Sequence, residues 1–94
     1  MTFLVIARDG EGTEAKARRQ AVRERHLDEI KPAVADGTVQ LGGALLGDDG
    51  EPIGSALIVA AESREALETF LKNDVYSQAG VWLSFDIFPF KRAV

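Results

Sequence analysis

The stretch VRERHL, residues 22–27, carries the only histidine of a 94-residue chain that has no cysteine. On a helix, where successive residues turn by ~100°, His26 lies on the same side as Val22 and Ile30. Arg23 falls within roughly 60° of His26 on that apolar side. A titratable ring and a guanidinium that face a core need hydrogen-bonding partners there. The stretch therefore indicates a functional site on the inner face of a helix, without saying what the site does.

Outward from this helix, apolar runs and chain-breaking residues divide the sequence into strands and helices. In the first half of the chain, the patterns predict a strand from Thr2 to Arg8, a helix from an N-cap at Thr13 to Lys31, and a strand from Thr38 to Leu46. In the second half, they predict a strand from Pro52 to Ala61 and a helix that is capped by Ser63 and ended by Asn73-Asp74. An irregular turn from Tyr76 to Gly80 and a strand from Val81 to Phe90 complete the predicted elements. Pro32 should kink or end the first helix because it cannot donate to the carbonyl four residues earlier.

The second strand contains an unusual glycine pair. Alternation places Val39, Leu41 and Leu45 on one face of this strand. Glycine weakens a strand interior and often marks a bulge or the close approach of a ligand or backbone. Gly42-Gly43 is therefore interpreted either as a twist or bulge, or as the wall of a pocket.

The last strand is apolar on both of its faces. Its two sets of side chains are Val81, Leu83, Phe85 and Ile87 on one side, and Trp82, Phe88 and Phe90 on the other. The second helix presents an inward stripe of Ala66, Leu67, Phe70 and Leu71. Two helices can cover only one face of the sheet, and a large apolar face left open marks an interface.

The order of the elements is β-α-β-β-α-β, the ferredoxin-like arrangement of the α+β class. We expect a single domain, residues 1–94, with a four-stranded antiparallel sheet and two helices on one face. The apolar surface of the other face predicts a homodimer that packs sheet against sheet.

Composition limits the classes of partner. The net charge of −4 argues against nucleic acid, whose binding relies on clustered Lys and Arg. The basic residues of the first helix, Lys16, Arg18, Arg19, Arg23 and Arg25, alternate with acidic ones and are interpreted as a solvated face, except for the inward Arg23. No run of residues has the length of a membrane span or the form of a signal peptide, so the cytoplasm is expected.

The whole chain resembles the YciI-like (YCII-related) family. The segments that carry the resemblance are residues 22–27, residues 37–46, Gly54-Ser55, residues 73–76, residues 79–81 and residues 89–91. No one of these motifs is highly specific, but their order and spacing together are.

The resemblance implies a ferredoxin-like fold that dimerises as an α+β barrel, with an active site built from a histidine on the first helix and an aspartate after the second. These positions fall on His26 and Asp74. Arg23 and Ser55 match positions near that site, and we assign them to substrate binding together with Tyr76. The relation to dimeric barrels such as muconolactone isomerase implies lyase or isomerase chemistry.

Two departures from the family pattern concern the site. The family has Asp-Pro-Tyr or Asp-Pro-Phe where this chain has Asp74-Val75-Tyr76, so Asp74 is expected to be held less rigidly. The Ala-Gly-Pro of the family is Gly42-Gly43-Ala44 here, which reshapes the pocket wall.

Three classes of function remain open. The first is a small enzyme in which a His/Asp pair moves protons on a small acidic substrate, with Arg23 holding an anion. The second is a non-catalytic dimeric module that binds small molecules or regulates a partner. The third, RNA binding, would need exposed aromatics and basic charge. One histidine and scattered carboxylates make a poor metal site, and we assign neither a metal nor a cofactor.

Overall fold

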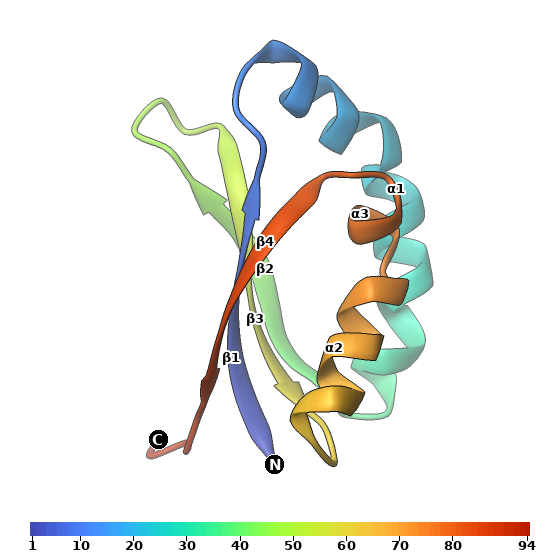
Figure 1. The fold of residues 1–94 in the computed structure, drawn as a ribbon, viewed down its shortest axis with the longest axis vertical. Coiled ribbons are helices and arrows are strands. Elements are labelled where there is room, and N and C mark those ends of the chain that lie inside the picture. The colour runs from blue at the N-terminus through green and yellow to red at the C-terminus, as the bar shows by residue number, and fades with distance from the viewer.

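The computed structural model describes residues 1–94 as one antiparallel sheet with every helix on the same side of it (Figure 1). In chain order the elements are β1 Thr2–Asp9, α1 Thr13–Ala35, β2 Val39–Leu46, β3 Pro52–Ala60, α2 Arg64–Asn73, α3 Val75–Gln78 and β4 Trp82–Pro89. The four strands lie in the order β2-β3-β1-β4. The β-α-β-β-α-β ferredoxin-like arrangement is thus confirmed, with one addition: α3 forms where an irregular turn was expected.

The core lies between the sheet and the helices. β1 sends Phe3, Val5 and Ala7 to the helical side, and each is at most 2% exposed. From α2, Leu67 and Leu71 are equally buried against this layer, whereas Ala66, expected on the same stripe, is exposed. Burial of one large aliphatic side chain stabilises a fold by roughly 1.5–3 kcal/mol. Ser63 caps α2 as predicted, and its hydroxyl accepts from the backbone of Ala66 at 3.1 Å.

α1 is longer than predicted at its C-terminal end. The helix passes through Pro32 to Ala35, because the carbonyl of Pro32 still accepts from the Asp36 amide at 3.0 Å. The proline removes only one hydrogen bond, in the last turns of the helix. Gly12 occupies the N-cap position, so the prediction of Thr13 as the cap was wrong.

A β-bulge in β2 changes which residues share a face. Val39 is opposite Val59 and Leu41 is opposite Ile58, so Gln40 is an extra residue. A bulge reverses the alternation of side chains beyond it. Val39 is therefore buried under the helices, while Leu41 is on the other face and is 69% exposed. The prediction that Val39, Leu41 and Leu45 share one face was wrong.

A second bulge, in β4, reorients Trp82. Arg8 pairs with Ser84 but Asp9 pairs with Trp82, which leaves Leu83 as the extra residue. Trp82 consequently faces the helices and is 4% exposed, whereas Leu83 is 64% exposed. The predicted faces of β4 were therefore wrong at these two residues.

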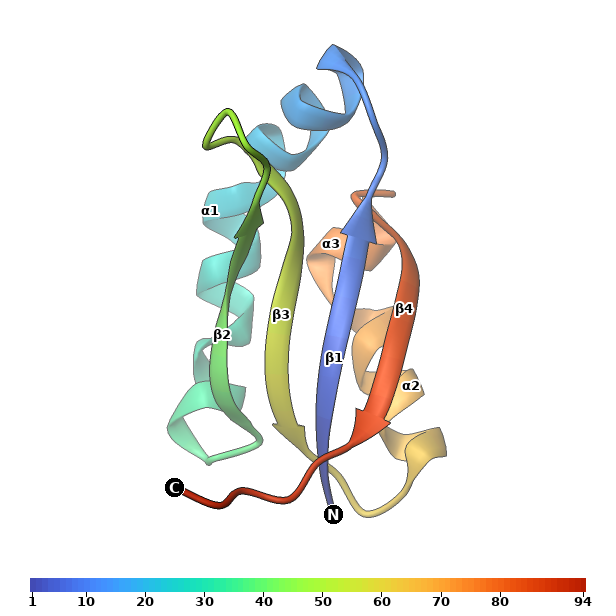
Figure 2. The ribbon, with the colours of Figure 1, turned by 90° about the vertical axis from the view of Figure 1, so that its left-hand side faces the viewer.

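The face of the sheet opposite the helices is open (Figure 2). It carries large apolar side chains from all four strands, among them Leu4, Ile6, Leu41, Ile58 and Phe88. None of the helices combines the length and the apolar character that crossing a bilayer requires.

Candidate functional site

The inner face of α1 carries two polar side chains in an otherwise apolar layer. Arg19 and His26 are each 8% exposed. They are seven positions apart, which on a helix leaves them within roughly 20° of one another. The prediction that Arg19 belongs to a solvated face was therefore wrong. The signal was in the sequence, because Arg19 is closer in angle to His26 than Arg23 is.

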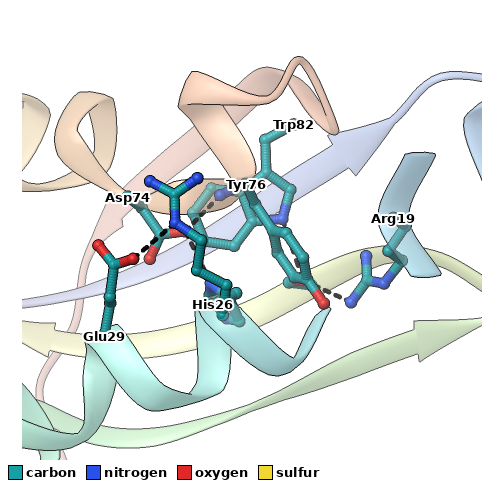
Figure 3. Close-up of polar contacts among 8 residues, drawn as sticks. Arg19, His26, Glu29, Asp74, Tyr76 and Trp82 are labelled. Atoms are coloured by element: carbon teal, nitrogen blue, oxygen red, sulfur yellow. Dashed lines mark hydrogen bonds and ion pairs between the residues drawn. The ribbon is translucent and has the colours of Figure 1, made fainter. Parts of the chain in front are cut away.

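His26 contacts the carboxylate of Asp74 (Figure 3). Its Nδ1 is 2.7 Å from Asp74 Oδ1, and both side chains are less than one-tenth exposed. The same oxygen accepts from the backbone amide of Tyr76 at 2.8 Å, because Asp74 is the N-cap of α3. This cap fixes Asp74 although the family's proline is absent. A carboxylate only accepts, so the ring carries its proton on Nδ1, and Nε2 is left for a ligand.

Two aromatic rings support His26. Tyr76 stacks on the imidazole with ring centroids 3.8 Å apart and an angle of 7° between the planes. Trp82 meets both rings edge-on, at 5.7 Å from His26 and 5.5 Å from Tyr76. Burial raises the pKa of Tyr76 above its usual value, so the phenol stays neutral near pH 7. The rings of Tyr76 and Trp82 hold the imidazole in one orientation.

Arg19 links two strands to the site. Its guanidinium donates to Asp9 Oδ2 at 2.7 Å and to Ser55 Oγ at 3.1 Å. Trp82 Nε1 donates to the same hydroxyl at 3.1 Å. The Arg19–Asp9 pair is almost fully buried, so removal of Arg19 would leave a buried charge without a partner. Sequence reasoning missed Asp9, Arg19 and Trp82 as parts of the site, the last because the bulge at Leu83 cannot be read from alternation.

The remaining predicted ligand-binding residues border a pocket of about 380 Å³ between α1, β2 and the centre of the sheet. Ser55 and Tyr76 lie in its wall beside His26. Arg23 also lines the pocket but is exposed, in contrast to its expected inward position, and it forms no ion pair within the chain. Asp74 is not part of the wall and lies behind His26.

Gly42-Gly43 borders the pocket, as one of the two interpretations expected, and the bulge of the other interpretation lies just before the pair. Gly42 is opposite Leu57 and faces α1, so its lack of a side chain leaves open space there, whereas Gly43 is opposite Ala56 on the other face of the sheet.

Comparison with known families identifies this arrangement. The model of the YCII-related domain matches residues 1–91. The chain belongs to the YCII-related family. Among solved structures, this YCII-related domain resembles 5-chloro-2-hydroxyhydroquinone dehydrochlorinase (TftG) from Burkholderia phenoliruptrix AC1100, in complex with 2,5-dihydroxybenzoquinone. The TM-score is 0.85 and the identity 30%, over 99% of this chain and 96% of the other.

Two fungal relatives differ in how much of their length the YCII-related domain matches. Fusaric acid biosynthesis protein 2 of Gibberella fujikuroi is 30% identical over 95% of this chain and 91% of its own length. Aspartate kinase FUB3 of Fusarium oxysporum f. sp. lycopersici is 31% identical over 97% of this chain, which spans only 18% of the kinase. The domain thus corresponds to nearly all of one relative and to a small part of the other.

Proposed function

We propose that this YCII-related domain is a small enzyme of the lyase or isomerase type, in which His26 moves a proton on a small acidic organic substrate. The observation that carries the proposal is the 2.7 Å contact between His26 and Asp74, with the imidazole in the wall of a pocket. The resemblance to a dehydrochlorinase that binds a dihydroxybenzoquinone supports both the reaction class and the kind of ligand.

Asp74 and His26 have separate roles in this mechanism. Asp74 accepts a hydrogen bond from Nδ1–H, which leaves the lone pair of Nε2 free to take a proton from a hydroxyl or an acidic C–H of the substrate. The carboxylate then stabilises the positive charge that the ring acquires. A positioned base of this kind contributes a factor of roughly 10²–10⁴ to the rate.

Arg23 is the cation available to the substrate. Arg19 is already paired with Asp9, whereas Arg23 has no partner in the chain and reaches the pocket from its rim. Its guanidinium can bind a carboxylate or an enolate oxygen and stabilise the anion that deprotonation creates. Ser55 accepts two hydrogen bonds and keeps its own proton to donate to a ligand.

The proton balance fits elimination and isomerisation equally. In an elimination, Nε2 takes the proton, the electron pair of the broken bond forms a carbonyl or alkene, and the leaving group departs with its bonding pair. In an isomerisation, the same proton returns to a different carbon. Ser55 has no base beside it and is not a nucleophile in either case.

The first test is the effect of Asp74→Asn on turnover. Chloride release from 5-chloro-2-hydroxyhydroquinone, measured without oxygen, is the first assay to run. Asn keeps the shape and the bond to the Tyr76 amide but removes the charge, so kcat should fall ~10²-fold or more while the melting temperature changes little. His26→Gln should be at least as damaging.

Glu29→Gln is the matched control, because Glu29 is an exposed carboxylate on the same helix that pairs with Arg25. It should keep full activity. Equal rates in Asp74→Asn and the wild type would contradict the mechanism. Tight binding of substrate without turnover by the wild type would instead make the domain a binding module.

We further propose that the domain acts as a homodimer formed through the open sheet face. The support is the apolar surface of that face, which no element of the chain covers.

A further inference from the structure

The pocket changes chemical character along its length. α1 contributes Arg19, Arg23 and His26 towards one end of the pocket, and Ile30 and Val34 towards the other. At ~1.5 Å per helical residue, His26 and Val34 are about 12 Å apart along the helix axis. A ligand whose acidic group meets His26 therefore has a further stretch of pocket beside it that offers no charge.

The strands that face α1 follow the same gradient. Ala44 pairs with Ser55, which binds Arg19, and so lies at the charged end. Gly42 pairs with the apolar Leu57, and Val39 begins β2 close to where α1 ends. All of these residues border the one pocket. β3 thus passes from the polar Ser55 to the apolar Leu57 in the same direction as α1, and the uncharged Gln40 of β2 is the one polar residue near the apolar end.

The apolar end is open to solvent. Leu27 is 40% exposed and Val34 is 53% exposed, although both belong to the wall of the pocket. Single exposed apolar side chains are common on protein surfaces. Here they continue, through Ile30 and Leu57, into the cavity that contains His26. A molecule bound at His26 is the occupant that this continuity favours.

Gly42 controls the space at the apolar end. A Cβ atom at this position would be 3.6 Å from Leu57 Cδ2 and 3.8 Å from Val39 Cγ1, which are ordinary contact distances. The positive-φ glycines of the chain do not include Gly42, so its backbone conformation does not require glycine. A side chain at position 42 is therefore compatible with the strand and would fill the space between Leu57 and Val39.

We propose that the pocket takes an acidic ring or enol that carries an apolar substituent, such as an unbranched alkyl chain of a few carbons, and that Gly42 keeps open the space for that substituent. The proposal rests on the proposed function in one respect, since it sets the acidic group of the ligand at His26 and Arg23. The substituent extends along α1 towards Val34.

The test measures the affinity of benzoate and of 4-n-alkylbenzoates, from methyl to hexyl, by isothermal titration calorimetry. Benzoate supplies the ring and the anion, and the alkyl chain supplies the apolar part. The dissociation constant should fall by up to about fourfold for each added methylene until the apolar end is full, and then level off. Dissociation constants that do not change from benzoate to the hexyl compound, or an absence of binding throughout the series, would overturn the inference.

Two glycine variants separate the apolar end from general effects on the strand. Gly42→Val should remove most of the gain per methylene and leave the affinity for benzoate within about twofold. In Gly43→Val the new side chain would meet no atom within 4 Å of its Cβ, so the dependence on chain length should remain. Gly42→Ala, which adds only the Cβ, should give an intermediate dependence and serves if the valine variant does not fold. Equal behaviour of the Gly42 and Gly43 variants would contradict the role of Gly42.

The outcome is distinguishable from that of the proposed function. His26→Gln should lose turnover but keep the gain in affinity per methylene, because the alkyl chain does not contact the imidazole. If instead the wild type turns over ring substrates and shows no dependence on chain length, the enzyme proposal stands and the inference falls. A dimer whose formation buries Leu27 and Val34, with no effect of chain length, would assign the apolar end to a second copy of the chain.

Discussion

His26, Tyr76 and Trp82 are each the only residue of their type in the chain, and all three meet at the pocket. The sequence alone singled out His26, since a ring on an inward helical stripe needs a partner. Asp74 followed only from the family resemblance, because a helix-terminal aspartate is otherwise unremarkable in sequence. Arg19 could have been found from helical angle alone. Trp82 could not, because its position depends on a backbone irregularity.

Tyr76 supplies a prediction about pH. Its buried phenol has a pKa above the usual 10.0, so the folded state holds the proton more tightly than the unfolded state does. The resulting contribution to stability is complete below pH 10 and is lost as the pH rises through the folded-state pKa. With one tyrosine, the absorbance change at 295 nm should have its midpoint above pH 10 in the native protein and close to 10 in guanidinium chloride. Coincident midpoints would contradict the assigned burial.

At the scale of the elements, the sequence predicted the order and nearly all of the boundaries, because apolar periodicity and turn residues are local signals. It failed where the tertiary structure outweighs a local rule. α1 continues through Pro32, since the cost of one lost hydrogen bond near the helix end is offset by the contacts of the last turns. α3 forms after Asp74 because the carboxylate caps it, a contact that depends on a side-chain rotamer and not on periodicity.

Pro32→Ala tests the cost of this proline. Alanine restores the missing amide in α1 and has a higher helix propensity, so the free energy of unfolding should rise by about 1–2 kcal/mol. This gain is smaller than at the centre of a helix, because Pro32 lies near the end of α1. Chemical denaturation of both proteins measures the difference. Lys31→Ala, at an exposed neighbouring position, should change stability by less than about 0.5 kcal/mol. A less stable Pro32→Ala protein would mean that the proline shapes the end of the helix.

For the whole molecule, the open sheet face decides the state of association. Phe88 lies on that face opposite Leu4 and is 52% exposed. If two sheets pack together, Phe88→Asp would bury a carboxylate without a partner, which costs several kcal/mol. We expect a dimer for the wild type and a monomer for Phe88→Asp in analytical ultracentrifugation.

Ala21→Asp is the matched control, because Ala21 is exposed on α1, and the helices lie on the side of the sheet opposite the open face (Figure 1). It should leave the dimer intact. A folded wild-type monomer at micromolar concentration would contradict the dimer. Trp82 cannot serve in this experiment, since it faces the helices and its replacement would damage the core.

Because Gln40 and Leu83 are extra residues in β2 and β4, the number of residues in these strands helps to determine which side chains line the pocket. In a regular strand, a side chain reaches the other face only if the chain gains or loses a residue. A substitution elsewhere in β4 would therefore not turn Trp82 away from His26, whereas deletion of the extra residue Leu83 would. Relatives that differ by a single gap in β2 or β4 would have differently built pockets even where the aligned residues are the same.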